Sequence, residues 1–165
     1  MNLKGQNIWA RLILISGSII FADQLTKYII KINMALYDNI IVIKNFFSIT
    51  HILNPGGAFG FFASSSPGVR KFIFLFVSSI VALLILWFYK KYAENFIFLS
   101  IGLALIFGGA VGNLIDRFIY GKVVDFLDFY MGTYHWPAFN IADSAITIGM
   151  GILIYHIIFK KIPDF

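Results

Sequence analysis

The chain has 165 residues, of which 59% are hydrophobic and 13% are charged, and its mean hydropathy is +0.84. An average soluble domain is roughly 45–50% apolar and about 25% charged, so this composition excludes a soluble globular domain and predicts an integral membrane protein. Four spans of about 20 residues each would use about half of the chain and leave no room for a separate soluble domain. We therefore expect residues 1–165 to form one membrane-embedded domain.

The net charge of +5 comes from 13 basic residues that are scattered along the chain. They form no run of five or more, so we expect them to anchor helices at lipid headgroups and predict no nucleic acid partner. The absence of cysteine excludes disulfides, thiol nucleophiles and cysteine-type zinc sites. The three histidines lie far apart, without the His-Glu-x-x-His spacing of zinc proteases, and we predict no metal site and no cofactor.

Four apolar runs are long enough to cross a membrane, at about residues 8–32, 72–89, 95–115 and 138–159. The first run has some features of a secretory signal, but it is too long, contains Asp23 and lacks a small-residue cleavage site, so we expect an uncleaved span. About five residues separate the second and third runs, which predicts a tight helical hairpin.

The connection between the first two spans is much longer, at about residues 33–70. Its segment 40–53 is rich in Ile, Val, Phe and Thr, which favours strands over a helix. We therefore predict a small extramembrane β-sheet on the membrane surface. It leads into the turn cluster Asn54-Pro55-Gly56-Gly57, whose glycines permit positive φ angles and a close approach of the backbone.

Because the spans alternate in direction, the polar groups near their ends must gather on one side of the membrane. Asp23 and Lys27 lie late in the first span, and they share that side with Asn54, with the segment 116–128 and with the start of the fourth span. Similar numbers of lysines and arginines flank the two sides, so the positive-inside rule does not decide the orientation.

Two carboxylates on this side form the candidate catalytic pair. Asp125 lies just beyond the third span and Asp143 lies about one turn inside the fourth, so the two helices can bring them together. In a partly dry site two carboxylates do not both ionise easily, and such a pair can activate water and protonate a leaving amine. The structural alternative is that each of the two acids caps a helix, and for Asp143 this role is about equally compatible with the sequence. We expect the neighbouring Asp128 to be a solvated loop acid.

The remaining polar residues have both functional and structural interpretations. Asn54, Asn113 and Asn140 can hold a peptide backbone, or they can be a turn residue, an interhelical hydrogen-bonding group and a helix cap. Arg117 either pairs with its neighbour Asp116 or orients the loop and a substrate. For Asp23 and Lys27, at i and i+4, an intrahelical ion pair near the interface is the simple structural expectation. The small residues at Gly108, Gly109, Ala110 and Gly112 predict close helix packing.

The polar residues also form four ordered motifs. These are Asp23-x-x-Thr26-Lys27, then Asn54-x-Gly56-x-Ala58-Phe59-Gly60, then Gly108-Gly109-x-x-Gly112-Asn113-x-x-Asp116-Arg117 followed by Gly121-x-Val123-x-Asp125-Phe126, and lastly Phe139-Asn140-x-Ala142-Asp143. Together they resemble the bacterial lipoprotein signal peptidases, the type II signal peptidases, over essentially the whole chain. Gly57 departs from the family, which more often has alanine there, and we expect the change to alter loop flexibility and not the chemistry.

The resemblance implies a function and a set of roles. It implies an intramembrane aspartyl endopeptidase that removes signal peptides from diacylglyceryl-modified prolipoproteins, cutting before the lipidated cysteine. It further implies a protein of the bacterial inner membrane with both termini cytoplasmic and its active site near the outer face, and we expect a monomer in contact with membrane lipids. The roles are catalytic for Asp125 and Asp143, substrate-binding for Asn54, Asn113, Arg117 and Asn140, and supporting for Asp23, Lys27, Gly56 and Asp116.

Two other classes of function are compatible with parts of the sequence. A small transporter would use Asp23 or Asp143 as its proton-coupling carboxylate. That function explains neither the strand-rich loop nor the gathering of acids at one face, since alternating access favours a site near the midplane. A non-catalytic assembly protein would tolerate Asp→Asn changes at both Asp125 and Asp143.

Overall fold

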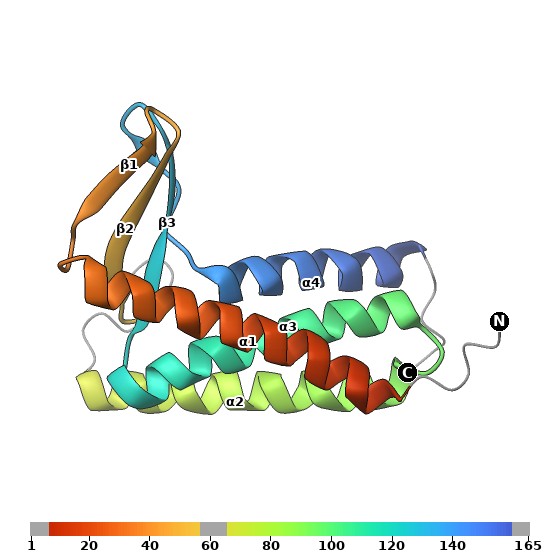
Figure 1. The fold of residues 1–165 in the computed structure, drawn as a ribbon. Helices are drawn as coiled ribbons and strands as arrows, with labels where there is room; N and C mark the ends of the chain where they lie inside the picture. The colour runs from red at the N-terminus through yellow and green to blue at the C-terminus, as the bar shows by residue number, and fades with distance from the viewer. Residues whose placement is uncertain (1–6, 57–65, 160–165) are drawn as a thin grey trace.

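The computed structural model describes residues 7–56 and 66–159, which form four long helices and one small sheet (Figure 1). The four helices are long and apolar enough to cross a membrane, and the sheet is separate from them, so the predicted architecture is confirmed. In chain order the elements are α1 (Ile8–Asn33), β1 (Asn39–Ile43), β2 (Phe47–Asn54), α2 (Pro67–Tyr92), α3 (Ile97–Tyr120), β3 (Val123–Met131), β4 (Tyr134–His135) and α4 (Ile141–Phe159).

The helix ends follow local capping signals more closely than the limits of the apolar runs. α2 begins at Pro67, earlier than residue 72, because the Ser66 hydroxyl accepts the Val69 N–H and proline suits the first helical position. α3 continues past residue 115 to Tyr120, because acids and bases do not by themselves end a helix. It ends at Gly121, whose φ of 68° is the left-handed conformation that glycine adopts readily.

α3 is the most buried helix and packs against the other three. Its glycines make this possible, as predicted. A Cβ atom on Gly112 would lie 2.8 Å from Asp23 Oδ2, closer than real Cβ atoms approach other atoms, so at that point the backbone of α3 packs directly against the Asp23 side chain of α1. Towards the other end of the bundle, α1, α2 and α3 enclose an apolar core around Tyr89, Leu99 and Leu103.

The sheet has the strand order β1-β2-β3-β4 with antiparallel pairing, and it rises across the end of the bundle where α1 and α3 end and α2 and α4 begin (Figure 1). The β1–β2 part agrees with the prediction. β3 was not predicted, and Asp125 therefore lies in a strand, near its start, and not in a loop. Its sequence, Val-Val-Asp-Phe-Leu-Asp-Phe-Tyr-Met, is rich in strand-forming residues, but its two acids suggested an exposed connection.

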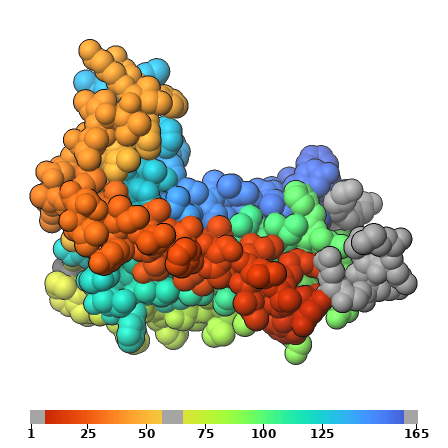
Figure 2. All heavy atoms as spheres, viewed as in Figure 1, coloured from red at the N-terminus to blue at the C-terminus, as the bar shows by residue number. Residues whose placement is uncertain are grey.

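The chain returns from the sheet to α4 along β3. Phe139 exchanges backbone hydrogen bonds with Leu127, 2.8 Å and 3.1 Å between nitrogen and oxygen, so that Asn140 lies beside Asp125 at the foot of the sheet. In the space-filling view the sheet forms a lobe that leaves an open angle above α4 (Figure 2).

Candidate functional site

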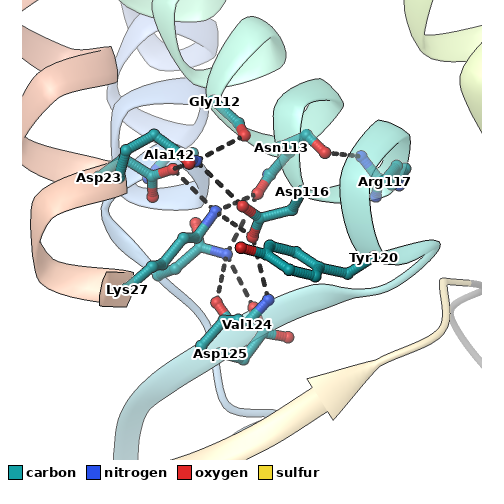
Figure 3. A network of polar contacts seen from close by, with 12 residues as sticks. Asp23, Lys27, Gly112, Asn113, Asp116, Arg117, Tyr120, Val124, Asp125 and Ala142 are labelled. Carbon is teal, nitrogen blue, oxygen red and sulfur yellow. Dashed lines mark hydrogen bonds and ion pairs between the residues drawn. The ribbon is translucent and has the colours of Figure 1, made fainter. Parts of the chain in front are cut away.

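A fully buried ion cluster joins the helices at the sheet end of the bundle (Figure 3). Lys27 Nζ lies 2.7 Å from Asp23 Oδ2 and 3.0 Å from Asp116 Oδ2. The expected intrahelical pair of Asp23 and Lys27 is therefore present, but it is buried and shared with a third residue. A lysine between two acids suits an interior position, because burying a charge without a partner is strongly unfavourable.

The two acids of this cluster also hold backbone groups of other elements. Asp23 Oδ1 accepts the N–H of Ala142 in α4 at 3.0 Å, and Asp116 Oδ2 accepts the N–H of Val124 in β3 at 3.1 Å. The cluster thus ties α1, α3, β3 and α4 to one another. Two of these elements, β3 and α4, carry Asp125 and Asp143.

Gln24 is a member of the cluster that the sequence interpretation missed. Its side-chain amide nitrogen, Nε2, donates to Asp116 Oδ1 at 3.0 Å and to the Gly112 carbonyl at 3.1 Å. A polar residue inside an apolar span and three positions before Lys27 was the available signal, because positions i and i+3 lie on one helix face.

Asn113 connects this cluster to Asp143. Its Oδ1 accepts a hydrogen bond from Lys27 Nζ at 3.0 Å, and its Nδ2 donates to Asp143 Oδ1 at 2.8 Å. Because the ammonium of Lys27 can only donate, it fixes which end of the amide faces it. The NH₂ group of Asn113 must therefore point at the carboxylate of Asp143.

Asn140 joins the two candidate catalytic acids. Its Nδ2 donates to Asp125 Oδ1 at 2.7 Å, and its Oδ1 accepts the N–H of Asp143 at 2.9 Å. The backbone N–H of Asn140 in turn donates to Asp143 Oδ2 at 3.3 Å. These reciprocal bonds form a capping box at the start of α4. Asp143 thus does belong to a helix cap, and the same contacts place it next to Asp125.

Asp125 is buried at the foot of β3, and its second oxygen, Oδ2, accepts a hydrogen bond from Asn54 Nδ2 at 2.9 Å. The pairing of β2 with β3 places Asn54 opposite Val123, on the same side of the strand as Asp125. Burial raises the pKa of Asp125 to about 6, and the charge of Asp143 acts in the same direction. The hydrogen bonds from Asn54 and Asn140 oppose this rise.

Arg117 and Gly56 lie on the α2 side of the site. Arg117 Nη1 contacts the Asn113 carbonyl at 3.5 Å and its guanidinium lies 5.7 Å from the centre of the Phe74 ring, while Asp116 pairs with Lys27 instead. Gly56 donates its N–H to Asn54 Oδ1 at 2.9 Å with a φ of 87°. The expected effect of Gly57 on the loop lies outside the described residues, as do Ala58, Phe59 and Gly60.

The prediction for Asp128 is wrong. Asp128 is buried, and its Oδ2 accepts the hydroxyl of Ser48 at 2.9 Å and contacts His135 Nδ1 at 2.9 Å. The reason is the unpredicted strand: β3 lies between β2 and β4, so an acid on it is covered from both sides.

A groove of about 530 Å³ opens beside Asp143. Trp136, Pro137, Ala138 and Phe139 form one wall, and Ser144, Thr147 and Ile148 of α4 form the other. The groove is mainly apolar and lies in the angle between the sheet and α4. Asp143 is therefore half-buried, with access from the side of the bundle.

Comparisons with known proteins agree with this geometry. Residues 15–159 match the family model described as signal peptidase (SPase) II. A lipoprotein signal peptidase of Desulforapulum autotrophicum is 64% identical over 154 residues, covering 93% of this chain and 95% of that protein. One from Syntrophus aciditrophicus is 45% identical over 146 residues, covering 88% and 91%.

A solved structure described as a bacterial membrane enzyme is similar in fold, with a TM-score of 0.80 and 36% identity over 91% of this chain and 94% of that one. The family match covers all four helices except the start of α1, and it includes every candidate site residue. The chain therefore belongs to the signal peptidase II family of proteases.

Proposed function

We propose that this protein is an aspartic endopeptidase that removes signal peptides from diacylglyceryl-modified prolipoproteins by cutting before the lipidated cysteine. The observation that carries the proposal is the convergence of Asp125 and Asp143 on one residue, Asn140, at the end of a membrane-spanning bundle. The family supports the substrate class, since its members here are lipoprotein signal peptidases.

The chemistry follows from the different surroundings of the two acids. Asp125 is buried and its pKa is raised, so it is the acid that keeps the proton shared by the dyad. Asp143 is half-buried and faces the groove, so its carboxylate takes a proton from water as the water oxygen attacks the peptide carbonyl. The C–N bond then breaks, and Asp125 gives its proton to the departing amine.

The amides and the arginine hold the substrate. Asn54, Asn113 and Asn140 each keep a carboxyl of the dyad in place. Asn54 is exposed and can contact the peptide backbone directly, whereas Asn113 and Asn140 are buried and act on the substrate by holding the dyad. Arg117 interacts electrostatically with both acids and supplies positive charge where the carbonyl oxygen becomes negative. Asp23, Lys27, Gly56 and Asp116 support this arrangement from behind.

The position of the site suits a lipid-anchored substrate. The dyad lies at the ends of the spans, where a diacylglyceryl group would hold a cysteine at headgroup depth. The apolar groove beside Asp143 opens towards the side of α4, so that the substrate enters laterally from the bilayer. We place the protein in the bacterial inner membrane as a monomer and a single domain, with both termini cytoplasmic and the site near the outer face.

The test is cleavage of a purified diacylglyceryl-modified prolipoprotein by the protein reconstituted in liposomes. Asp125→Asn and Asp143→Asn should each lower the rate by about 10³-fold or more, while both proteins still insert and fold. Asp128→Asn is the matched control, because it changes the other buried acid of β3 and should keep activity. Full cleavage by either dyad variant would refute the proposal. Proton-coupled uptake in the same liposomes would instead favour a transporter.

A further inference from the structure

We propose that the far end of the sheet binds the phosphate headgroup of a membrane phospholipid, at a site built around His135 and separate from the dyad. This site, the tip pocket, is a hollow of about 480 Å³ whose walls include Phe46, Phe129, Tyr130, Tyr134, His135 and Trp136. The proposal does not depend on the cleavage chemistry.

The imidazole of His135 is held in one orientation. Its Nδ1 contacts both oxygens of Asp128, at 3.0 Å and 2.9 Å, and its ring stacks on Tyr130 at 4.8 Å between ring centres and 8° between planes. Asp128 is itself fixed, because Ser48, which has no exposed surface, donates to it. With Nδ1 committed inward and the side chain 49% exposed, Nε2 is the ring nitrogen left for a group outside the protein.

This arrangement is not a second hydrolytic triad. In a nucleophilic triad the histidine contacts the serine hydroxyl, whereas here Asp128 lies between Ser48 and His135. The buried serine has no access to a substrate. The acid therefore serves to orient the histidine. In the imidazolium form Nδ1–H donates to Asp128 and Nε2–H points outward, where it can donate to a phosphate oxygen, whereas the neutral ring with its proton on Nδ1 presents only an acceptor there.

The position of the tip pocket identifies the phosphate as that of a lipid. The sheet runs across the long direction of the four helices (Figure 1), so when these span a bilayer the sheet extends along its surface. At its far end Tyr134 and Trp136 are 82% and 69% exposed. Tyrosine and tryptophan favour the headgroup region, where the ring body is apolar and its polar edge is hydrated. The ammonium group of a zwitterionic lipid could make cation–π contacts with the faces of these rings.

The pocket is rigid enough to select a ligand. Asn45 donates its N–H to the Tyr130 hydroxyl at 3.2 Å, and Tyr130 donates its N–H to the Phe46 carbonyl at 2.9 Å. Phe46 and Phe129 meet edge to face at 5.4 Å. These contacts bind the β1–β2 turn to β3, so the aromatic walls are in place before a lipid arrives.

The chain offers a direct probe, because it has only three histidines. We would label the imidazole Cε1 positions of the full-length protein in detergent and follow the three resonances by NMR while adding dihexanoylphosphatidylethanolamine. His135 is assigned by its loss in His135→Gln. We expect the His135 resonance to shift in a saturable way, whereas those of His51 and His156, which do not line the pocket, stay in place.

Variants and competing ligands decide the outcome. Trp136→Ala and Asp128→Asn should weaken lipid binding at least fivefold, whereas Ile41→Ala, an exposed apolar residue elsewhere on the sheet, should not change it. Dihexanoylglycerol, which lacks the phosphate, should leave the His135 resonance unshifted. The proposal is overturned if the phospholipid does not shift this resonance, if dihexanoylglycerol shifts it equally, or if inorganic phosphate binds as tightly as the lipid.

Discussion

Two pairs of acids lie close together at the sheet end of the bundle, and their partners differ. Asp23 and Asp116 share the ammonium of Lys27, whereas Asp125 and Asp143 are both held by neutral N–H groups of Asn140, the side-chain amide for Asp125 and the backbone N–H for Asp143. A positive charge lies between the two acids of the first pair and within ion-pair distance of both. Neutral N–H groups orient the second pair without neutralising it, and under the proposed mechanism these two acids share a proton. The same functional group would then serve stability in one place and chemistry in the other.

The largest expected effect is a loss of activity without an equal loss of stability at Asp125 and Asp143, the pair held by Asn140. Asp125→Asn should lower the cleavage rate by about 10³-fold or more, because the variant cannot donate a proton. The folded protein should lose no more than about 1–2 kcal/mol of stability. A buried acid with a raised pKa is replaced by a neutral group of the same shape, but the new NH₂ group faces one of the two amide donors, Asn54 or Asn140. Thermal unfolding in detergent beside the cleavage assay measures both. A loss of stability equal to the loss of activity would contradict the distinction.

At Asp23 and Asp116, the pair held by Lys27, a loss of stability is expected instead. Lys27→Met leaves two buried carboxylates without a counter-ion and should lower the free energy of unfolding by about 3 kcal/mol. Lys31→Met is the control on the same helix, and losing its contact with the Tyr120 hydroxyl should change stability by less than about 1 kcal/mol. Denaturant unfolding of the detergent-solubilised proteins compares them. Equal stability of the two variants would show that the buried cluster is not what holds the helices.

A smaller effect is expected where α3 meets Asp23. Gly112→Ala would place a methyl group 2.8 Å from Asp23 Oδ2 and should cost about 1–3 kcal/mol of stability, because the cluster has to shift to admit it. Gly151→Ala in α4 is the matched control, since no atom lies within 4 Å of its added Cβ. That variant should be neutral or slightly stabilising. Equal melting temperatures of the two variants would show that close packing at Gly112 does not contribute to stability.

The smallest effect is a shift in the pH dependence of cleavage. Asn54 donates a hydrogen bond to Asp125 that favours the carboxylate and so lowers the pKa of that acid. Asn54→Ala should therefore raise the pKa above about 6. Because the dyad is active while it holds its proton, the alkaline fall in kcat/KM should move to higher pH by roughly half a unit to one unit. Asn39→Ala, an exposed amide on β1, should leave the profile in place; a shift to lower pH in Asn54→Ala would refute the assignment.

The sequence predicted the parts of the molecule that depend on composition and local pattern. The apolar runs indicated four helices, and the Ile- and Val-rich segment before Asn54 indicated strands. β3 was not predicted because Asp125 and Asp128 interrupt its apolar pattern, and what makes it a strand is pairing with β2, which is distant in sequence. The order of the motifs named the candidate residues, but it could not show that Lys27 fixes the amide of Asn113.

The double role of Asn140 has a consequence for biogenesis. This residue caps α4 and also holds Asp125, so the first turn of the last helix and the dyad form together. A chain with only its first three spans in the membrane carries one acid of the pair and lacks the other, together with the residue that joins them. Under the proposed mechanism, an unfinished protein in the membrane is not a protease, and proteolytic competence is acquired only as the fourth span folds into place.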